Sequence, residues 1–207
     1  SRRQRQMCIR DRHFIGLTIE TNENKFDPST VILMDFRCNQ SRGLHFIYVI
    51  PFSKKKALIE STLFSKNIED RKFYLSAINS YLKENFNTNF FKVLKEEKGI
   101  IPMQYMNFSL ENSVSIGTRG GATKPSSGYT FIYIQKQISN IIYQLNNNLK
   151  INNFIHTKFS LFMDKIFIKA LEKNPKSFPD LFYKMNSKLS GDETVSYTHL
   201  RAHETEL

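Results

Sequence analysis

The sequence of 207 residues is long enough for one or two domains with a hydrophobic core, and its 40% hydrophobic and 24% charged residues are ordinary for a globular protein. It contains no apolar run of the roughly 18 residues that a membrane-spanning helix needs, and no signal-peptide pattern at its start. Two cysteines exclude a disulfide framework and fit a reducing, cytoplasmic compartment, while the net charge of +11 favours an acidic partner or an anionic membrane surface.

The two ends differ in composition from the rest of the chain. All the lysines lie between Lys25 and Lys188, whereas most of the arginines lie in residues 1–12 and 195–207. These segments, SRRQRQMCIRDR and VSYTHLRAHETEL, resemble translated sequencing-adapter read-through, so we expect both to be non-native. Without them the formal charge is +8. His199 and His203 fall in the second segment with no further ligands nearby, so no metal site is predicted.

Residues 13–101 are predicted to be mainly β with one helix. Three strand-like runs lie at residues 31–37, 44–52 and 57–64, and the short polar stretches between them predict an antiparallel meander. Residues 68–86 then have apolar side chains at helical spacing. Two more strands are expected at residues 90–96 and 100–103, on either side of a turn at Lys98 and Gly99.

The second half is predicted to be mostly helical. A short strand at residues 113–116 leads into a glycine-rich loop, and an asparagine-rich loop is expected at residues 146–153. Helices are predicted at residues 127–145, 155–172 and 179–189. The first of these has an apolar face made of Phe131, Ile134, Ile138, Ile141, Ile142 and Leu145.

The glycine-rich loop, SIGTRGGATKPSSGY at residues 115–129, lies between a predicted strand and a predicted helix. Glycines let a backbone approach a ligand closely, and a helix N-terminus offers unpaired N–H groups to a phosphate or a flavin carbonyl. The alternative is a structural turn in which Ser126 or Ser127 caps the helix. The loop matches neither a phosphate-binding GxxxxGK motif nor a GxGxxG fingerprint.

Glu60 is the carboxylate that the sequence places in an apolar strand, ALIESTLF. Strand alternation puts Leu58, Glu60 and Thr62 on one face of this strand. If Glu60 is buried its pKa should be raised, and a protonated carboxyl facing an apolar cavity could protonate a hydrocarbon double bond. The alternative is a solvent-facing glutamate paired with Lys55 or Lys56. Glu96 and Glu97 are weaker candidates, because EEK before a glycine is typical of an exposed turn.

Several segments, in order and with suitable spacing, resemble the lycopene cyclase family of flavoproteins. They are HFIGLTIE (13–20), VILMDFR (31–37), FIYVIPFS (46–53), ALIEST (57–62), KEEKGIIPM (95–103) and GTRGGATKPSSGYTF (117–131). PDLFYKMNSKLSGD (179–192) is similar to the C-terminal helical end of bacterial members.

The resemblance implies a mixed α/β and α+β fold like that of aromatic hydroxylases, with an FAD-binding Rossmann part and a substrate domain built on an antiparallel sheet. Residues 13–112 would be the substrate domain, residues 113–150 the C-terminal part of the FAD-binding domain, and residues 151–194 the C-terminal helices. It also implies cyclisation of lycopene or a related acyclic carotenoid to β-rings with no net redox change. Reduced FAD would be required without being consumed, and NAD(P)H would keep it reduced.

The resemblance also implies roles for particular residues. The family's catalytic glutamate falls on Glu60, and the acidic residue that usually follows it is Ser61 here, which removes one carboxylate from any two-carboxylate scheme. The second FAD-contacting loop of the family falls on Gly117, Thr118, Gly120, Gly121, Pro125, Gly128 and Tyr129.

The family's GxGxxG half should precede His13 and is absent, so we expect the N-terminal Rossmann half to be missing. We therefore expect this chain alone to bind FAD weakly, to be inactive as a cyclase, and to aggregate through an exposed flank.

Two other classes of function remain open on the sequence. Another FAD-dependent isoprenoid enzyme, of the epoxidase or geranylgeranyl reductase type, would share the loop without needing an acid at Glu60. A basic module that binds nucleic acid is the other, but the lysines are scattered apart from Lys54, Lys55 and Lys56, and no RNA-binding signature occurs. The basic surface also suits a cytoplasmic enzyme that contacts a membrane peripherally to collect its substrate.

Overall fold

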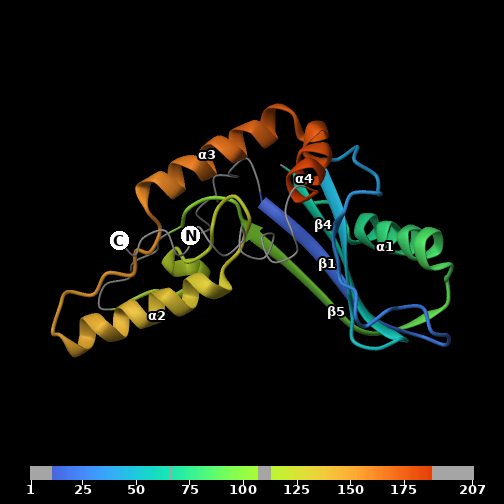
Figure 1. Ribbon diagram of the computed structural model, residues 1–207, viewed down its shortest axis with the longest axis horizontal. Helices are drawn as coiled ribbons and strands as arrows, with labels where there is room; N and C mark the ends of the chain where they lie inside the picture. The colour runs from blue at the N-terminus through green and yellow to red at the C-terminus, as the bar shows by residue number, and fades with distance from the viewer. Residues whose placement is uncertain (1–10, 66, 107–112, 188–207) are drawn as a thin grey trace, which may run out of the picture.

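The computed structural model describes residues 11–65, 67–106 and 113–187 (Figure 1). One antiparallel sheet contains β1 (Asp11–Thr21), β2 (Ile32–Asp35), β3 (Leu44–Pro51), β4 (Lys56–Ser65) and β5 (Phe91–Pro102). The α-helices are α1 (Arg71–Phe86), α2 (Phe131–Asn146), α3 (Lys158–Lys173) and α4 (Phe178–Asn186), with 3₁₀ turns η1 (Gly117–Gly120) and η2 (Pro175–Ser177). Figure 1 shows α1 on one side of the sheet and α2 and α3 on the other, which confirms the predicted mixed fold class.

The strand order is β2-β3-β4-β1-β5. The predicted meander is confirmed, because β2 pairs with β3 and β3 with β4, all antiparallel. β1 then lies between β4 and β5, so segments from before and after the meander complete the sheet. Asp11 and Arg12, the last residues of the segment that resembles adapter read-through, lie in β1. The non-native origin of that segment and the domain limits stay predictions.

Helix α1 covers one face of the sheet. It begins at Arg71 because the carboxylate of Asp70 accepts a hydrogen bond of 2.8 Å from the N–H of Phe73, and it ends at Asn87 in the left-handed conformation. The core between them consists of Ile15, Leu17, Ile19, Ile47, Val49, Ile59 and Leu63 from the sheet, with Tyr74, Ile78, Tyr81 and Leu82 from α1.

Replacing Ile59 by Ala is expected to lower the free energy of unfolding by about 2–5 kcal/mol, because it removes fully buried methyl groups and leaves a cavity under α1. Val31→Ala is the matched control, since Val31 is half exposed and its loss should cost little. Urea unfolding followed by circular dichroism measures both. A cost for Ile59→Ala no larger than that of Val31→Ala would contradict the packing of α1 on this face.

A second core cluster joins the sheet to the C-terminal helices. Leu44, Phe46, Phe64 and Met103 pack with Leu171 of α3 and Phe178 of α4. Phe178 and Phe182 also form ring contacts with Phe167, and Phe182 stacks on Phe36. This cluster holds α3 and α4 against one end of the sheet, where Figure 1 shows α4 above β4.

The prediction of two strands around a turn at Lys98 and Gly99 is wrong, because β5 runs through both residues. Gly99 pairs with Phe14 of β1, and a Cβ on Gly99 would lie 2.6 Å from a ring carbon of Phe14. The glycine is therefore needed to admit an aromatic ring from the neighbouring strand, a long-range requirement that looks like a turn signal in the sequence.

The predicted strand at residues 113–116 is also wrong, because only Ser113 makes a bridge and the chain enters η1 directly. Helix α2 starts at Phe131, later than predicted. The preceding residues form a closed turn in which the N–H of Gly128 donates to the carbonyl of Lys124 and the N–H of Lys124 donates to the carbonyl of Tyr129, at 2.8 and 2.9 Å. α3 begins at Lys158 because the hydroxyl of Thr157 caps it.

Helix α2 presents its apolar face to the surface. Phe131, Ile138, Ile142 and Leu145 are exposed, while Gln137 and Gln144 are buried on the side next to this stripe. An amphipathic helix is expected to pack its apolar face on the core, and α2 does not. Its orientation follows from hydrogen bonds that the two glutamines make to neighbouring loops. In the part of the chain that the structure describes, no helix is both long and apolar enough to cross a membrane.

Candidate functional site

The sheet has two different faces, and Glu60 lies on the one that α1 does not cover. Ile59 and Leu63 lie on the other face of the same strand and belong to the core under α1. The Glu60 side chain is only 15% exposed and lies 3.7 Å from the guanidinium of Arg12. The alternative of a solvent-facing glutamate paired with Lys55 or Lys56 is therefore wrong, and the predicted strand face is confirmed.

The surroundings of Glu60 favour its protonated form overall. Burial raises the pKa of Glu60 above its ordinary value, and the nearby charge of Glu97 raises it further. A hydrogen bond of 2.6 Å from the hydroxyl of Thr62 and the charge of Arg12 oppose this rise in pKa. A carboxyl with a raised pKa on a partly apolar surface suits proton donation.

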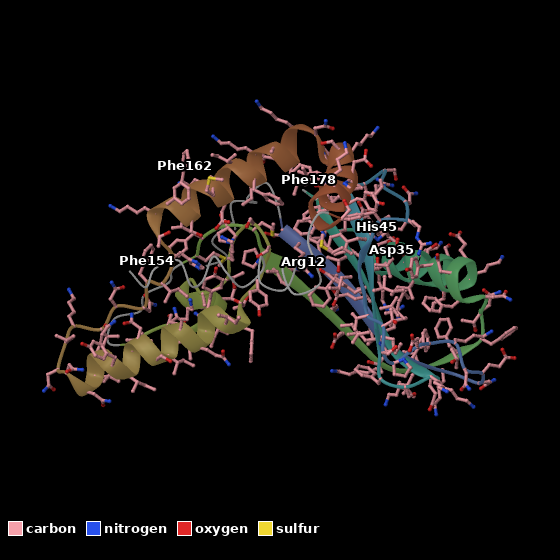
Figure 2. The ribbon with its side chains drawn as sticks, in the orientation of Figure 1. Arg12, Asp35, His45, Phe154, Phe162 and Phe178 are labelled. Carbon is pink, nitrogen blue, oxygen red and sulfur yellow. The ribbon has the colours of Figure 1, made fainter. Side chains whose placement is uncertain are left out.

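Arg12 connects the Glu60 face to the helical half of the molecule. Its guanidinium lies over the rings of Phe46, Tyr48 and Phe64, with 5.6–5.9 Å between the guanidinium carbon and the ring centres. It also donates a hydrogen bond of 3.1 Å to the carbonyl of Ser127 in the glycine-rich loop. Figure 2 shows Arg12 between the sheet and the helical half, with His45 and Asp35 on the α1 side.

The glycine-rich loop packs against the same sheet face. Gly128 has a φ of 72°, and a Cβ there would lie 3.1 Å from a methyl carbon of Ile101 in β5 and 3.6 Å from Arg12. A side chain at Gly128 would thus meet both a strained backbone and the neighbouring strand. The two candidate sites predicted separately from the sequence, Glu60 and the loop, therefore lie next to each other.

Gln137 of α2 holds the loop, and sequence analysis missed it. Its amide nitrogen donates to the carbonyls of Gly120 and Asn153, and its amide oxygen accepts from the N–H of Gly117, each at 2.8 Å. Gln137 is fully buried. A glutamine on a helix normally faces solvent, so only the position of the loop reveals its role.

The other end of the loop is tied to α3. The ammonium of Lys124 pairs with the carboxylate of Asp164 at 2.8 Å and donates to the hydroxyl of Ser160 at 3.0 Å. His156 lies beside this pair, 4.5 Å from the ring of Tyr133, and burial lowers its pKa. The ion pair and Gln137 together fix the loop from two helices.

The loop and α2 have features that fit an acceptor-rich cofactor. Within the described residues Thr130 makes no side-chain cap of α2, and a helix N-terminus without such a cap suits a phosphate or a flavin carbonyl. Ser127 does not cap the helix, because its hydroxyl accepts from the N–H of Tyr129 within the turn. The expectation that Ser127 caps α2 is therefore wrong, while the choice between a structural turn and a ligand-binding loop stays a prediction. Gly117, Thr118, Gly120, Gly121, Pro125, Gly128 and Tyr129 all lie in this loop segment.

The opposite sheet face carries a different polar group that has no catalytic geometry. His45 bonds to the hydroxyl of Ser61 at 2.8 Å and to the carbonyl of Asn39 at 2.9 Å, and both side chains are fully buried. A cavity of about 470 Å³ nearby is lined by residues including Cys38, but burial raises the pKa of the Cys38 thiol to about 12. Position 61 therefore points away from Glu60, so an acid there would not share its face.

Glu97, a weaker candidate acid in the sequence, lies elsewhere than its sequence context predicts. It was assigned to an exposed turn, but it lies in β5 in register with Gly16 of β1, and Gly16 is in register with Glu60 of β4. Paired residues of an antiparallel sheet share a face, so Glu60 and Glu97 are on the same one. Glu96 is on the α1 face, where Arg71 holds it with hydrogen bonds of 2.9 and 2.6 Å.

A family model described as lycopene cyclase protein matches residues 1–191. The chain belongs to the lycopene cyclase family. It is 28% identical over 146 residues to the lycopene beta-cyclase of Paracoccus sp. (strain N81106 / MBIC 01143), an alignment that covers 67% of this chain and 37% of that protein. The chain thus spans 37% of the length of this curated relative.

Among solved structures, the fold is similar to that of a geranylgeranyl bacteriochlorophyll reductase-like protein from Thermoplasma acidophilum. The TM-score is 0.47 at 10% identity, over 77% of this chain and 39% of the other. Among the described residues of this lycopene cyclase family member, no cluster of three or more His, Cys, Asp or Glu could hold a metal ion. His199 and His203 lie outside the described residues.

Proposed function

We propose that this chain supplies the acid and part of the cofactor-binding surface of a lycopene cyclase that closes the ψ-ends of an acyclic carotenoid to β-rings. The observation that carries the proposal is the contact of the glycine-rich loop with the Glu60 face of the sheet, where Gly128 lies against Ile101 of β5. Membership of the lycopene cyclase family and the beta-cyclase relative support the choice of substrate. The reaction is an isomerisation with no net redox change.

Glu60 is the proposed proton donor. Its O–H bond breaks as a C–H bond forms with the π electrons of a terminal double bond, which leaves a carbocation. A second double bond of the same chain attacks this cation and closes the ring. A C–H bond of the ring then breaks, its electrons form the ring double bond, and the proton leaves to solvent water. Burial favours the acid form of Glu60 before the reaction, and the hydrogen bond from Thr62 stabilises the carboxylate that results.

The hydrocarbon end is proposed to lie on the sheet face that carries Glu60. Phe14, Tyr48, Ile50 and Leu58 are partly buried on this face and offer apolar contact to the hydrocarbon. The ring of Tyr48 is packed edge-on against Phe46, which fixes its orientation beside Glu60. Aromatic rings next to a developing positive charge stabilise it through their electron-rich faces.

Reduced FAD is the proposed cofactor, with NAD(P)H as the source of its electrons. The uncapped start of α2 and the loop residues Gly117, Thr118, Gly120 and Gly121, with Pro125, Gly128 and Tyr129, would hold it. When bound, the reduced flavin supplies an electron-rich group close to the cation and is not consumed. The residues of this chain hold the loop in place through Gln137 and Lys124.

Cyclase activity is proposed for a longer protein that contains this chain, and the chain alone is proposed to be inactive. The rest of the longer protein would pack on the exposed apolar stripe of α2. This stripe carries no charge and consists of Phe131, Ile138, Ile142 and Leu145. The deciding experiment expresses the longer protein in lycopene-accumulating cells and identifies the pigments by chromatography. Cyclic carotenoids support the proposal. Unchanged lycopene contradicts it, and epoxidised or saturated products would favour the epoxidase or reductase type.

Peripheral membrane contact in the cytoplasm is part of the proposal, and α3 is the surface proposed for it. Its outer face exposes Phe159, Phe162 and Ile166, and the same face carries the exposed lysines Lys158, Lys165, Lys169 and Lys173. Figure 2 labels Phe162 on this helix. Apolar side chains mixed with lysines suit an anionic bilayer, whereas the uncharged stripe of α2 suits a protein partner.

Binding of the 207-residue chain to vesicles tests this surface. We expect Lys165→Gln and Lys169→Gln each to weaken binding to phosphatidylglycerol-containing vesicles about fivefold, because each lysine near an anionic surface contributes about 1 kcal/mol. Phe159→Ser should weaken it about tenfold. Ile142→Ser on α2 is the matched control. Binding that the α3 changes leave intact, or a preference for duplex DNA over vesicles, would contradict the assignment.

A further inference from the structure

Glu97 has a position that its own sequence context does not predict. The pairing of β4, β1 and β5 places Glu60, Gly16 and Glu97 in one row across the sheet, all on the face that α1 leaves open. Gly16 has no side chain, so no side chain of β1 lies between the two glutamates, and the gap between them is one strand wide.

The Glu97 side chain fills this gap. A Cβ built on Gly16 would lie 3.1 Å from Cγ of Glu97 and 3.4 Å from its carboxylate oxygen Oε1, with Cδ1 of Leu58 at 3.2 Å. Glu97 therefore lies over β1 in the direction of β4, and its carboxylate approaches that of Glu60. The charge of Glu97 accordingly contributes to the raised pKa of Glu60.

The two carboxylates differ in their access to water. The side chain of Glu60 is 15% exposed, and that of Glu97 is 39% exposed. The charged and titratable groups that interact with the pair are Arg12 on β1 and Tyr48 on β3, both beside Glu60, and Lys95 on β5, 3.3 Å from Glu97. Lys95 is itself exposed, so solvent screens its attraction for the Glu97 carboxylate.

We propose that Glu97 passes protons between solvent and Glu60 across Gly16, as the second carboxylate of the cyclisation site. The inference rests on the proposed function. A proton taken up by the exposed carboxylate of Glu97 moves to the carboxylate of Glu60, which has just lost its own to the substrate, and the pair returns to its starting charge. No oxidant or reductant takes part. Glu97 acts on the substrate only through Glu60, so it is a positioning and proton-supplying residue.

The coupling of the two carboxylates is measured on the longer protein and needs no activity. Glutamate labelled with ¹³C at the side-chain carboxyl is titrated by NMR, and Glu60→Gln assigns the Glu60 resonance. We expect Glu97→Gln to lower the pKa of Glu60 by about half a unit or more, because a neighbouring negative charge is removed. Glu96→Gln is the matched control on the opposite face of β5 and should leave it unchanged. An unchanged pKa in Glu97→Gln would overturn the proposal.

The proton transfer itself is measured in the longer, cyclising protein by reaction in D₂O. With Glu97 present, Glu60 exchanges with solvent between turnovers, so each ring formed should carry about one deuterium. In Glu97→Gln the proton removed from the ring returns to Glu60 and is used again in the next turnover. We therefore expect the deuterium content per ring to fall by about half or more, and turnover to be slower. Gly16→Ala, whose methyl group displaces Glu97, should act in the same direction.

The two measurements separate the possible failures. A lowered pKa of Glu60 with unchanged deuterium in Glu97→Gln would overturn the transfer role and leave only an electrostatic effect. A longer protein that leaves lycopene uncyclised would remove the proposed function, while the NMR titration would still decide whether the two carboxylates are coupled. Loss of deuterium in Glu96→Gln as well would show that the effect is not specific to the Glu60 face.

Discussion

Replacing Glu60 by Gln in the longer protein is expected to reduce cyclisation of lycopene at least about 100-fold, because a positioned general acid contributes about 10²- to 10⁴-fold to rate. Glutamine keeps the size of the side chain and can still accept a hydrogen bond from Thr62, but it has no acidic proton to give to a double bond. The measurement is the ratio of cyclic carotenoids to lycopene in lycopene-accumulating cells, with the flavin content of the purified protein as the check on folding.

The pH dependence of the cyclisation rate is a second test of Glu60. Because burial raises the pKa of Glu60, its acid form persists to higher pH than that of an ordinary glutamate, and the rate should fall as the pH rises through this raised pKa. Ser61→Ala is a suitable control, since Ser61 lies on the α1 face and bonds to His45. If Glu60→Gln cyclises as well as the wild type, Glu60 is a structural residue and the acid must be sought elsewhere.

Replacing Gln137 by Leu is expected to weaken FAD binding at least about tenfold in the longer protein. The change removes the acceptor of the Gly117 N–H and the donor to the buried carbonyl of Gly120, and a buried polar group left unpaired costs about 1–3 kcal/mol. The loop would move away from the Glu60 face so that these backbone groups could form hydrogen bonds with water. Flavin fluorescence titration gives the affinity, and thermal unfolding gives the accompanying loss of stability.

The control for Gln137 is Gln135→Leu on the same helix. Gln135 is exposed, so its replacement has the same chemistry without the buried hydrogen bonds. We expect wild-type affinity for Gln135→Leu. Equal affinities for the wild type and Gln137→Leu would show that the loop keeps its conformation without this residue, or that FAD binds elsewhere.

The sequence by itself determined the local elements and the two chemical candidates. Alternation in ALIESTLF put Glu60 opposite Ile59 and Ser61, and polar stretches between apolar runs predicted the β2-β3-β4 meander, both of which are local patterns with a period of two residues. The glycines of residues 117–128 marked a loop with unusual backbone angles, as three of them have, because glycine alone adopts these without cost.

Only the tertiary structure decided what these elements face. Gly99 looked like a turn because the ring of Phe14 that needs its space lies on a strand far away in the sequence. For the same reason Glu97 looked like a turn residue although it lies in β5, and nothing in the sequence marked Gln137 as the residue that holds the loop. Burial, register across strands and side-chain hydrogen bonds to distant loops depend on contacts between segments, and no spacing within one segment encodes them.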